Sequence, residues 1–478
     1  MLINLALAYP ELLLAASALC LLVFGAFNPK ATGAVGLLAV LTLIGAAAIS
    51  AFGAHGGSAF SGSLKGDAAA AYASVAIYLA SAAAIPLGGN WFARKGVATF
   101  EFPVLILLAA LGMGMMVSAG DLIALYIGIE LQSLALYVLA AMYRDDLKAS
   151  EAGLKYFVLG ALSSGMLLYG SSLIYGFAGS TRFEDIAAAV HQGAHTGVLF
   201  GLIFLICGLA FKVSAAPFHM WTPDVYEGAP TPVVGFFAGA PKLAAMVLFA
   251  RVLYECFPGA IAQWRQVLII LALASITVGA FAGLNQNNLK RLWAYSSIAN
   301  VGYAILGLAA GNAEGVQAML VFMVLYIVDV TGFFACLTAL SRQGKAMETI
   351  EDMAGLFKEQ PGIALAMTAF SLSALGLPPF SGFFAKFYVF KAAIALGDPM
   401  LMWAAIAGLV GSVVAAFYYL RLIRAMWFQT SAGSTDTPPV DAKVLALGAA
   451  LFTAPVVWLV LNLIDTQARL AAAAFGLN

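Results

Sequence analysis

The sequence predicts an all-α integral membrane protein of about fourteen transmembrane helices, and three observations support this prediction. Hydrophobic residues make up 63% of the 478 residues and charged residues only 10%. A soluble domain has about 25% charged residues, so this chain has too few to cover a surface that faces water. Apolar stretches of about 20 residues, long enough to cross a bilayer as a helix, recur without a long polar linker. These stretches are continuous rather than alternating, which excludes a transmembrane β-barrel.

The predicted spans follow one another along the whole chain. The first seven cover residues 9–27, 33–52, 71–88, 103–118, 122–143, 156–177 and 197–215. The other seven cover residues 231–254, 267–284, 292–310, 316–340, 362–396, 401–427 and 444–464. Because residues 362–396 are too long for one straight span and contain Pro378 and Pro379, we expect a broken helix with free carbonyl groups there. A proline kink that serves only packing is the alternative.

The distribution of the 23 lysine and arginine residues predicts the orientation of the chain. One set of alternate connections carries about fourteen of them and the other set about five. Connections rich in these residues face the cytoplasm, so we expect both termini outside it.

Several ionisable residues fall inside the predicted spans, where each lysine costs about 2.5–3.5 kcal/mol at a helix centre. They are Glu130, Lys212, Lys242, Asp329, Lys386 and Lys391. Glu130 lies near the middle of its span, and a carboxylate and lysines at similar depth would offset one another's desolvation. Lys391 lies nearer the outer end, where a lysine can snorkel, and the sequence names no partner for Asp329. A transport path and a static ion pair both remain open.

Composition and motifs exclude several functions. The formal net charge is zero, so no basic patch for nucleic acid is expected. The four cysteines are far apart and form no CxxC pair. We therefore expect buried free thiols rather than an iron–sulfur or zinc site. The chain also has no complete nucleotide-binding loop, so nucleotide chemistry must lie elsewhere.

Two stretches carry a resemblance to a known family. FKVSAAPFHMWTPDVYEGAPTP (residues 211–232) and LKRLWAYSSIAN (residues 289–300) resemble the antiporter-like subunits of the NADH-quinone oxidoreductases, respiratory complex I. Within that group, MWTPDVYEG and a lysine rather than a glutamate at Lys386 resemble the subunit N family. The resemblance covers most of the chain.

The resemblance implies two inverted five-helix repeats, each with one broken helix. The implied divisions are an N-terminal three-helix segment (residues 1–100), the repeats (residues 103–255 and 266–428) and a C-terminal helix (residues 442–478), all in one polytopic domain. The implied proton-path residues are Glu130, Lys212, Lys242 and Lys386, with His219 near the cytoplasmic side. The family often has histidine where this chain has Asn300, which cannot titrate, so a water would have to substitute there.

The resulting hypothesis is a proton-translocating membrane subunit of complex I in the bacterial inner membrane. The resemblance implies that NADH, FMN, iron–sulfur clusters and quinone belong to partner subunits, that this chain holds no cofactor, and that its neighbours are other membrane subunits. Three alternatives remain: a subunit of a multi-subunit sodium/proton antiporter, a stand-alone secondary transporter and a structural membrane scaffold. The ionisable residues inside the spans argue most strongly against the scaffold.

Overall fold

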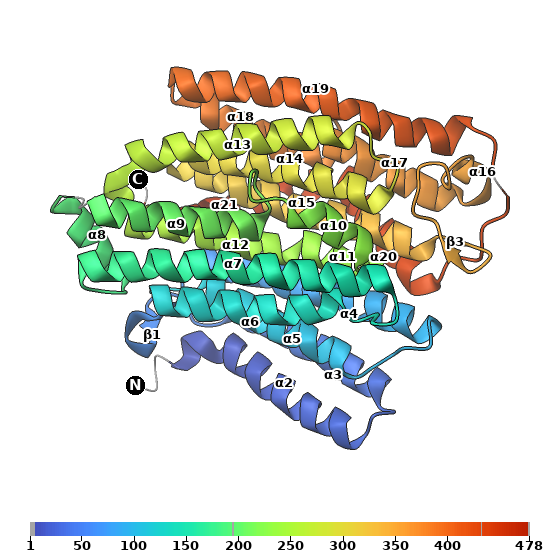
Figure 1. Cartoon of the computed structure of the whole chain (residues 1–478), viewed down its shortest axis with the longest axis horizontal. Coiled ribbons are helices and arrows are strands. Elements are labelled where there is room, and N and C mark those ends of the chain that lie inside the picture. Colours follow the sequence, from blue (N-terminus) through green and yellow to red (C-terminus); the bar gives the residue numbers. More distant parts are fainter. Residues whose placement is uncertain (1–4, 194–195, 432, 477–478) are drawn as a thin grey trace.

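The computed structural model describes residues 5–193, 196–431 and 433–476, and most of them lie in helices that run side by side in one bundle (Figure 1). The hairpin of β1 (Ser58–Ala59) and β2 (Leu64–Lys65) lies at one end of the bundle. The hairpin of β3 (Ser341–Arg342) and β4 (Lys345–Ala346) lies at the other end. The first and last described residues, near η1 and at the end of α21, both lie at the end that carries β1. An even number of membrane crossings accounts for this arrangement.

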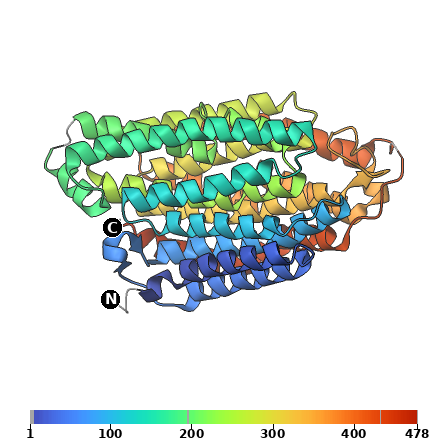
Figure 2. The ribbon, with the colours of Figure 1, turned by 60° about the horizontal axis from the view of Figure 1, so that its bottom comes forward.

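The helices of the first half have the following bounds. They are η1 (Ala6–Ala8), α2 (Tyr9–Phe27), α3 (Thr32–Phe52), η2 (Phe60–Gly62), α4 (Ala68–Arg94), α5 (Glu101–Val117), α6 (Leu122–Ala140), α7 (Leu147–Ala178), α8 (Phe183–His191), α9 (Thr196–Val213), α10 (Trp221–Gly228), α11 (Thr231–Ala238) and α12 (Ala240–Arg251). In Figure 2 the N-terminal helices form one side of the bundle.

The second half continues with a similar set. It contains η3 (Val252–Cys256), η4 (Pro258–Ala260), α13 (Ile261–Gly283), α14 (Leu289–Ala309), α15 (Ala313–Ala339), α16 (Leu356–Glu359), α17 (Pro361–Leu375), α18 (Ser381–Ala395), α19 (Pro399–Phe428), α20 (Val440–Leu451), η5 (Phe452–Val456) and α21 (Val457–Ala473). Twelve helical segments of the described chain are long and apolar enough to cross a membrane. The shorter α5 and the broken α17–α18 add the two further crossings that the sequence predicted.

Short polar side chains fix where many of these helices begin. The carboxylate of Asp121 accepts a hydrogen bond from the Ala124 amide at the start of α6, at 2.6 Å. Asp67, Asp146 and Asn288 cap α4, α7 and α14 in the same way. Such caps satisfy amides that have no partner within the helix. Because of its cap, α7 begins at Leu147 rather than at the predicted residue 156, although its first turns are polar.

Four of the crossings are interrupted. The predicted break at Pro378–Pro379 is present between α17 and α18, and another break, which the resemblance implied without placing it, lies near Pro217 between α9 and α10. A break at Gly239, between α11 and α12, was not predicted. The C-terminal crossing is interrupted by the π-helical η5, which contains Pro455. Each break frees backbone groups inside the bundle, where polar side chains can reach them.

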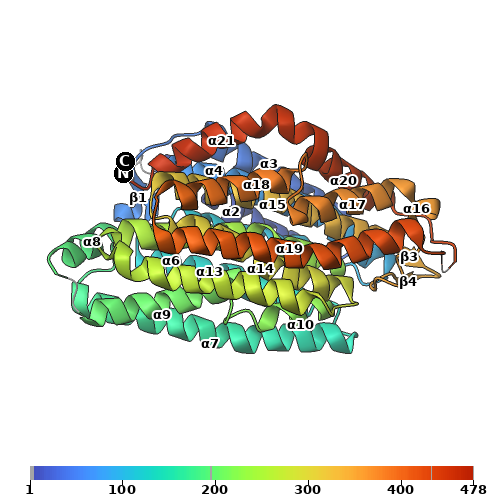
Figure 3. The same cartoon turned by 90° about the horizontal axis from the view of Figure 1, so that it is seen from above.

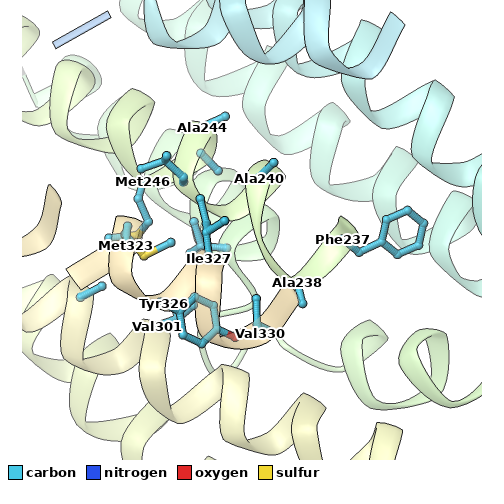
Figure 4. Close-up of a cluster of buried hydrophobic side chains, with 14 of the residues drawn as sticks. Phe237, Ala238, Ala240, Ala244, Met246, Val301, Met323, Tyr326, Ile327 and Val330 are labelled. Atoms are coloured by element: carbon cyan, nitrogen blue, oxygen red, sulfur yellow. The ribbon is translucent and has the colours of Figure 1, made fainter. Parts of the chain in front are cut away.

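The interrupted helices surround the most deeply buried part of the bundle. Every residue of α12 is buried, and α15 packs against α11, α12, α14, α17, α18, α20 and α21. Figure 4 shows Ile327 of α15 beside Ala240, where the chain passes from α11 to α12. The helices α20 and α21 cross the bundle over α4 and α15 (Figure 3). A charged side chain on α12 therefore has no route to lipid.

The cysteines are free, as predicted, but only partly buried. Cys256 and Cys336 are buried, Cys207 is half-buried and Cys20 is exposed. The expectation of burial was therefore wrong for Cys20, which is exposed on α2. A membrane helix is apolar on the face toward lipid as well as on the face toward the protein, so an apolar stretch does not predict burial within the protein.

Candidate functional site

Three lysines inside the bundle each lie beside a helix interruption. Lys212 is in the last turn of α9, directly before the break at residues 214–220. Lys242 lies in the first turn of α12, after Gly239, and Lys386 lies on α18 beyond the second proline break. Lys242 and Lys386 are 1% and 7% exposed. Because a buried ammonium group needs hydrogen-bond acceptors, the contacts of each lysine decide what it can do.

Lys212 contacts a face of α6 that carries Glu130, Ser133 and Tyr137. The Lys212 Nζ donates a hydrogen bond to the Ser133 hydroxyl at 2.8 Å and lies 6.0 Å from the centre of the Tyr137 ring. Glu130 is one helical turn before Ser133, and among the described residues its Oε1 is buried without a hydrogen-bond partner. Glu130 and Lys212 were expected to offset one another's desolvation cost. In the described chain they form no direct ion pair.

Lys242 of α12 donates a hydrogen bond to a hydroxyl group on α14 that also accepts one from α15. Its Nζ donates to the Ser297 hydroxyl of α14 at 2.6 Å, and the Tyr326 hydroxyl of α15 donates to the same oxygen at 2.7 Å. The ring of Tyr226 lies 5.6 Å from the ammonium nitrogen. None of the described carboxylates lies within ion-pair distance of Lys242. The lysine is therefore held by groups that can both donate and accept hydrogen bonds.

Lys386 donates hydrogen bonds to carbonyl groups that the proline break was expected to leave free. Its Nζ donates to the carbonyl oxygens of Ala374 at 2.9 Å and Leu375 at 3.1 Å, at the end of α17. A third hydrogen bond, 3.2 Å long, reaches the Ser412 hydroxyl of α19. The Tyr303 ring lies 4.6 Å from the ammonium nitrogen, within range of a cation–π interaction.

Asp329, for which the sequence named no partner, binds three hydroxyl groups. Its carboxylate accepts hydrogen bonds from Ser373 at 2.5 Å, from Ser381 at 3.0 Å and from Thr453 at 2.6 Å. Ser373 and Ser381 lie on the two sides of the α17–α18 break, and Thr453 lies in the π-helical η5. The aspartate therefore joins α15 to two interrupted crossings.

A small cavity lies between Asp329 and Lys386. It is lined by both side chains and by Ser296, Asn300 and Tyr326, and about 20 Å³ of it is open to the centre of a water molecule. A cavity needs roughly 10–15 Å³ by this measure, and two to four polar partners, to hold one water. The cavity therefore has room for about one water, and the carboxylate and the amine both belong to its lining.

The remaining predicted residues lie away from this cavity. Lys391 is exposed, and with Lys386 and Ser412 it lines an open, mostly apolar groove of about 590 Å³. Lys386 thus lies between the internal cavity and this groove. His219 is half-buried in the break between α9 and α10, and its Nδ1 has no partner among the described residues.

Sequence reasoning missed the hydroxyl groups of the site. Ser133, Ser297 and Ser412 bind the three lysines, and Tyr326 binds Ser297. Serine and tyrosine are frequent in membrane helices, so each one alone predicts little. Ser133 carried the clearest signal, because it lies one turn from Glu130 on the same face of a helix.

Comparisons with known proteins connect this arrangement to a family. The sequence model described as "NADH:quinone oxidoreductase/Mrp antiporter, TM" matches residues 119–414. Over 391 residues the chain is 72% identical to NADH-quinone oxidoreductase subunit N of Caulobacter sp. strain K31, covering 81% of each chain. It is 51% identical to subunit N of Rhodospirillum rubrum, covering 94% of this chain and 93% of that one.

Solved structures agree with these relationships. A chain in the respiratory complex I of Thermus thermophilus, solved with bound aureothin, is 32% identical, with a TM-score of 0.80 over 96% of this chain and 98% of that one. A chain of the Mrp complex from Dietzia sp. DQ12-45-1b shares the fold, with a TM-score of 0.82 over 99% of this chain and 98% of that one at 20% identity. The chain therefore belongs to the NADH:quinone oxidoreductase/Mrp antiporter family of membrane subunits and, within it, to the subunit N group.

Proposed function

We propose that this chain is a proton-translocating membrane subunit of an NADH-quinone oxidoreductase. The observation that carries the proposal is the set of three lysines inside the bundle, Lys212, Lys242 and Lys386, each hydrogen-bonded to hydroxyl or carbonyl groups beside a helix break. Ionisable groups placed at membrane depth usually mark a transport path. The identity to subunit N relatives over most of the chain supports the assignment to this complex.

The chemistry of the complex is divided between its subunits in this proposal. This chain contributes to NADH:quinone reductase activity as a membrane component, and its neighbours are other membrane subunits and the lipid bilayer. NADH, FMN, iron–sulfur clusters and quinone belong to partner subunits. The widely separated cysteines and the missing nucleotide loops support that division.

In the proposed route a proton reaches Lys212 near Glu130, moves to Lys242, and continues to Lys386. Each transfer leaves a neutral amine behind and forms an ammonium group at the next lysine. Water and hydroxyl groups carry the proton between them, since a hydroxyl can accept one proton and release another. His219 lies toward the cytoplasmic side of this route, and Lys391 lies on the groove beyond Lys386. Quinone reduction in a partner subunit supplies the driving force.

The proposed setting is the bacterial inner membrane, with both termini on the side away from the cytoplasm. The lysine- and arginine-rich connections support this orientation, and many of them lie at the end of the bundle that carries β3 and α16 (Figure 1). We also propose the division into residues 1–100, 103–255, 266–428 and 442–478. The breaks within residues 103–255 and 266–428 support the two-repeat organisation.

The test uses the assembled complex in membrane vesicles. Lys212→Met should lower the number of protons pumped per NADH oxidised, because methionine fills the site but carries no proton. Glu130→Gln should have the same direction of effect. Lys30→Met, which changes an exposed lysine, is the matched control. Normal pumping by the Lys212 and Glu130 variants would refute the proposal.

The sodium/proton antiporter remains the competing function, because the Mrp chain has the same fold. That likeness is at 20% identity, whereas the subunit N relatives reach 72%. Replacing sodium with choline in the vesicle assay distinguishes the two. NADH-driven proton uptake that does not depend on sodium is the expected result, and sodium-dependent transport without NADH would favour the antiporter.

A further inference from the structure

We propose that Asp329 is a proton-relay residue, which accepts a proton that comes from Lys242 and passes it to Lys386. This inference rests on the proposed function. It concerns the transfer from Lys242 to Lys386, which lie on different proposed repeats. Asp329 lies on α15. Tyr326, one turn earlier on the same helix, donates to the Ser297 hydroxyl that binds Lys242. One helix therefore carries both the carboxylate and the hydroxyl that reaches Lys242.

The cavity supplies the contact between the carboxylate and the second lysine. Tyr326, Asp329 and Lys386 all line it, and it has room for a single water. Its lining residues come from α14, α15, α17 and α18, so the cavity lies where these helices meet. A water there can receive a hydrogen bond from Lys386 and donate to Asp329 and to the Tyr326 oxygen, whose own hydrogen is donated to Ser297. This geometry joins Lys242 to Lys386 through Ser297, Tyr326, one water and Asp329.

Asn300 lines the same cavity but does not provide a relay. Its side-chain nitrogen donates to the Ser296 carbonyl oxygen at 3.0 Å, and an amide neither gains nor loses a proton near neutral pH. Among the side chains that line the cavity, Asp329 supplies a carboxyl group and Lys386 an amine, and each of these can gain or lose a proton. The carboxylate is therefore the intermediate acceptor that this part of the route offers.

One proton moves from Lys242 to Asp329 and then from Asp329 to Lys386. The Tyr326 hydroxyl, which donates to Ser297 in the structure, first turns to donate to the cavity water, and the Ser297 hydroxyl turns to donate to Tyr326. The Lys242 ammonium then releases one proton to Ser297, Ser297 and Tyr326 each accept one proton and release another, and the cavity water transfers one to the carboxylate. Asp329 is then a neutral acid and Lys242 a neutral amine. The acid returns its proton through the water to the neutral Lys386 amine, which becomes an ammonium group. The carboxylate is regenerated, and no bond other than O–H and N–H changes.

The hydroxyl groups around Asp329 offer a competing explanation, in which the carboxylate only holds the break together. Ser373 also accepts a hydrogen bond from the Gly382 amide at 2.8 Å, so the cluster plainly stabilises the start of α18. A structural role requires an acceptor at this position, whereas a relay requires a group that titrates. Asparagine keeps an acceptor oxygen and removes the titration, so it separates the two roles.

The experiment measures NADH oxidation and proton uptake in vesicles that contain the whole complex. We expect Asp329→Asn to lower proton uptake by about tenfold or more, in the range that loss of a proton-transfer group produces. Asp329→Glu should restore part of it. Adding Asn300→His to Asp329→Asn should also restore uptake, because an imidazole would then face the same cavity; Asn300→His alone is the matched control.

Each outcome decides between the explanations. Normal pumping by Asp329→Asn, with pumping lost in Lys212→Met, overturns the relay and leaves the proposed function standing. Normal pumping in both overturns the proposed function. Loss in Asp329→Asn that neither second change rescues shows a structural role only and also overturns the relay. If Asp329→Asn does not assemble, Tyr326→Phe is measured instead, and normal pumping in that variant contradicts the relay.

Discussion

Hydroxyl groups, rather than carboxylates, accept hydrogen bonds from two of the lysines inside the bundle. Ser133 binds Lys212, and Ser297 binds Lys242. A hydroxyl accepts from an ammonium group and can turn to donate to a neutral amine, so the contact survives loss of the proton. A carboxylate at the same distance would strongly favour the charged lysine. Side chains of this kind suit a lysine that changes its charge during each cycle.

Ser297→Ala should weaken both the structure and the transport. The change removes the acceptor of Lys242 and of Tyr326, and a buried donor left without a partner costs about 1–3 kcal/mol. We expect lower thermal stability of the purified complex and slower proton uptake. Ser297→Thr, which keeps the hydroxyl, should recover most of both. Ser164→Ala is the control, because the buried Ser164 hydroxyl has no partner among the described residues; an equal effect of the two alanine changes would count against the prediction.

The sequence predicted which residues of the site are charged, but not what they bind. Lys386 was expected to lie beside free carbonyl groups, because two adjacent prolines remove two amide donors from a helix. The partners of Asp329 were not predictable, since they come from three segments that only the packing of the bundle brings together. Similar depth predicted that Glu130 and the lysines offset one another's desolvation and left a static ion pair open, because depth does not determine which helix faces are opposite each other.

The break at the adjacent Pro378 and Pro379 was predictable, whereas the breaks at Gly239 and at Pro455 in η5 were missed. Pro378 and Pro379 identified the α17–α18 break, whereas Gly239 lies in an apolar run where glycine usually only serves close packing. The extra turns of α7 were missed because charged residues end a hydropathy window without ending a helix. The fourteen crossings themselves were predictable, because bilayer thickness sets their length.

Gly382→Ala should damage the start of α18. A Cβ on Gly382 would lie 1.9 Å from the Ser373 carbonyl oxygen, and a backbone atom cannot move away as a flexible side chain can. We expect much less of this subunit in assembled complex, measured by quantitative immunoblotting of membranes. Gly165→Ala is the matched control, since a Cβ there would meet nothing within 4 Å. Equal amounts of the two variants would contradict the prediction.

Across the whole molecule, one buried arginine joins segments that are far apart in the chain. The Arg251 guanidinium, 0% exposed, contacts the Val117 carbonyl oxygen at 2.5 Å, Glu255 at 2.6 Å and Asp67 at 2.7 Å. Lys65 of β2 binds Glu255 at 2.9 Å. Burial disfavours the charge of Lys65, but the Glu255 carboxylate outweighs it and raises the pKa of Lys65. This charged cluster joins the β1–β2 hairpin to α4, α5 and α12.

Arg251→Met should therefore destabilise the whole subunit. Removing one partner from a buried charge network leaves the others uncompensated, at a cost of about 3–5 kcal/mol. The measurement is the thermal unfolding temperature of the purified complex together with protease resistance. Arg94→Gln serves for comparison, because the partly exposed Arg94–Asp441 pair should contribute about 0–1 kcal/mol. Similar unfolding temperatures for both variants would show that the cluster is not essential to stability.

Near the end of the described chain, the ring of Phe475 lies over this guanidinium, with 5.6 Å between the ring centre and the guanidinium carbon. Genetic engineers often shorten membrane proteins at their ends or replace the last residues with a purification tag. Here such trimming would remove the Phe475 ring that covers the Arg251 guanidinium, and solvent could then reach a charge that the fold buries. A truncation should therefore retain Phe475 and the residues before it.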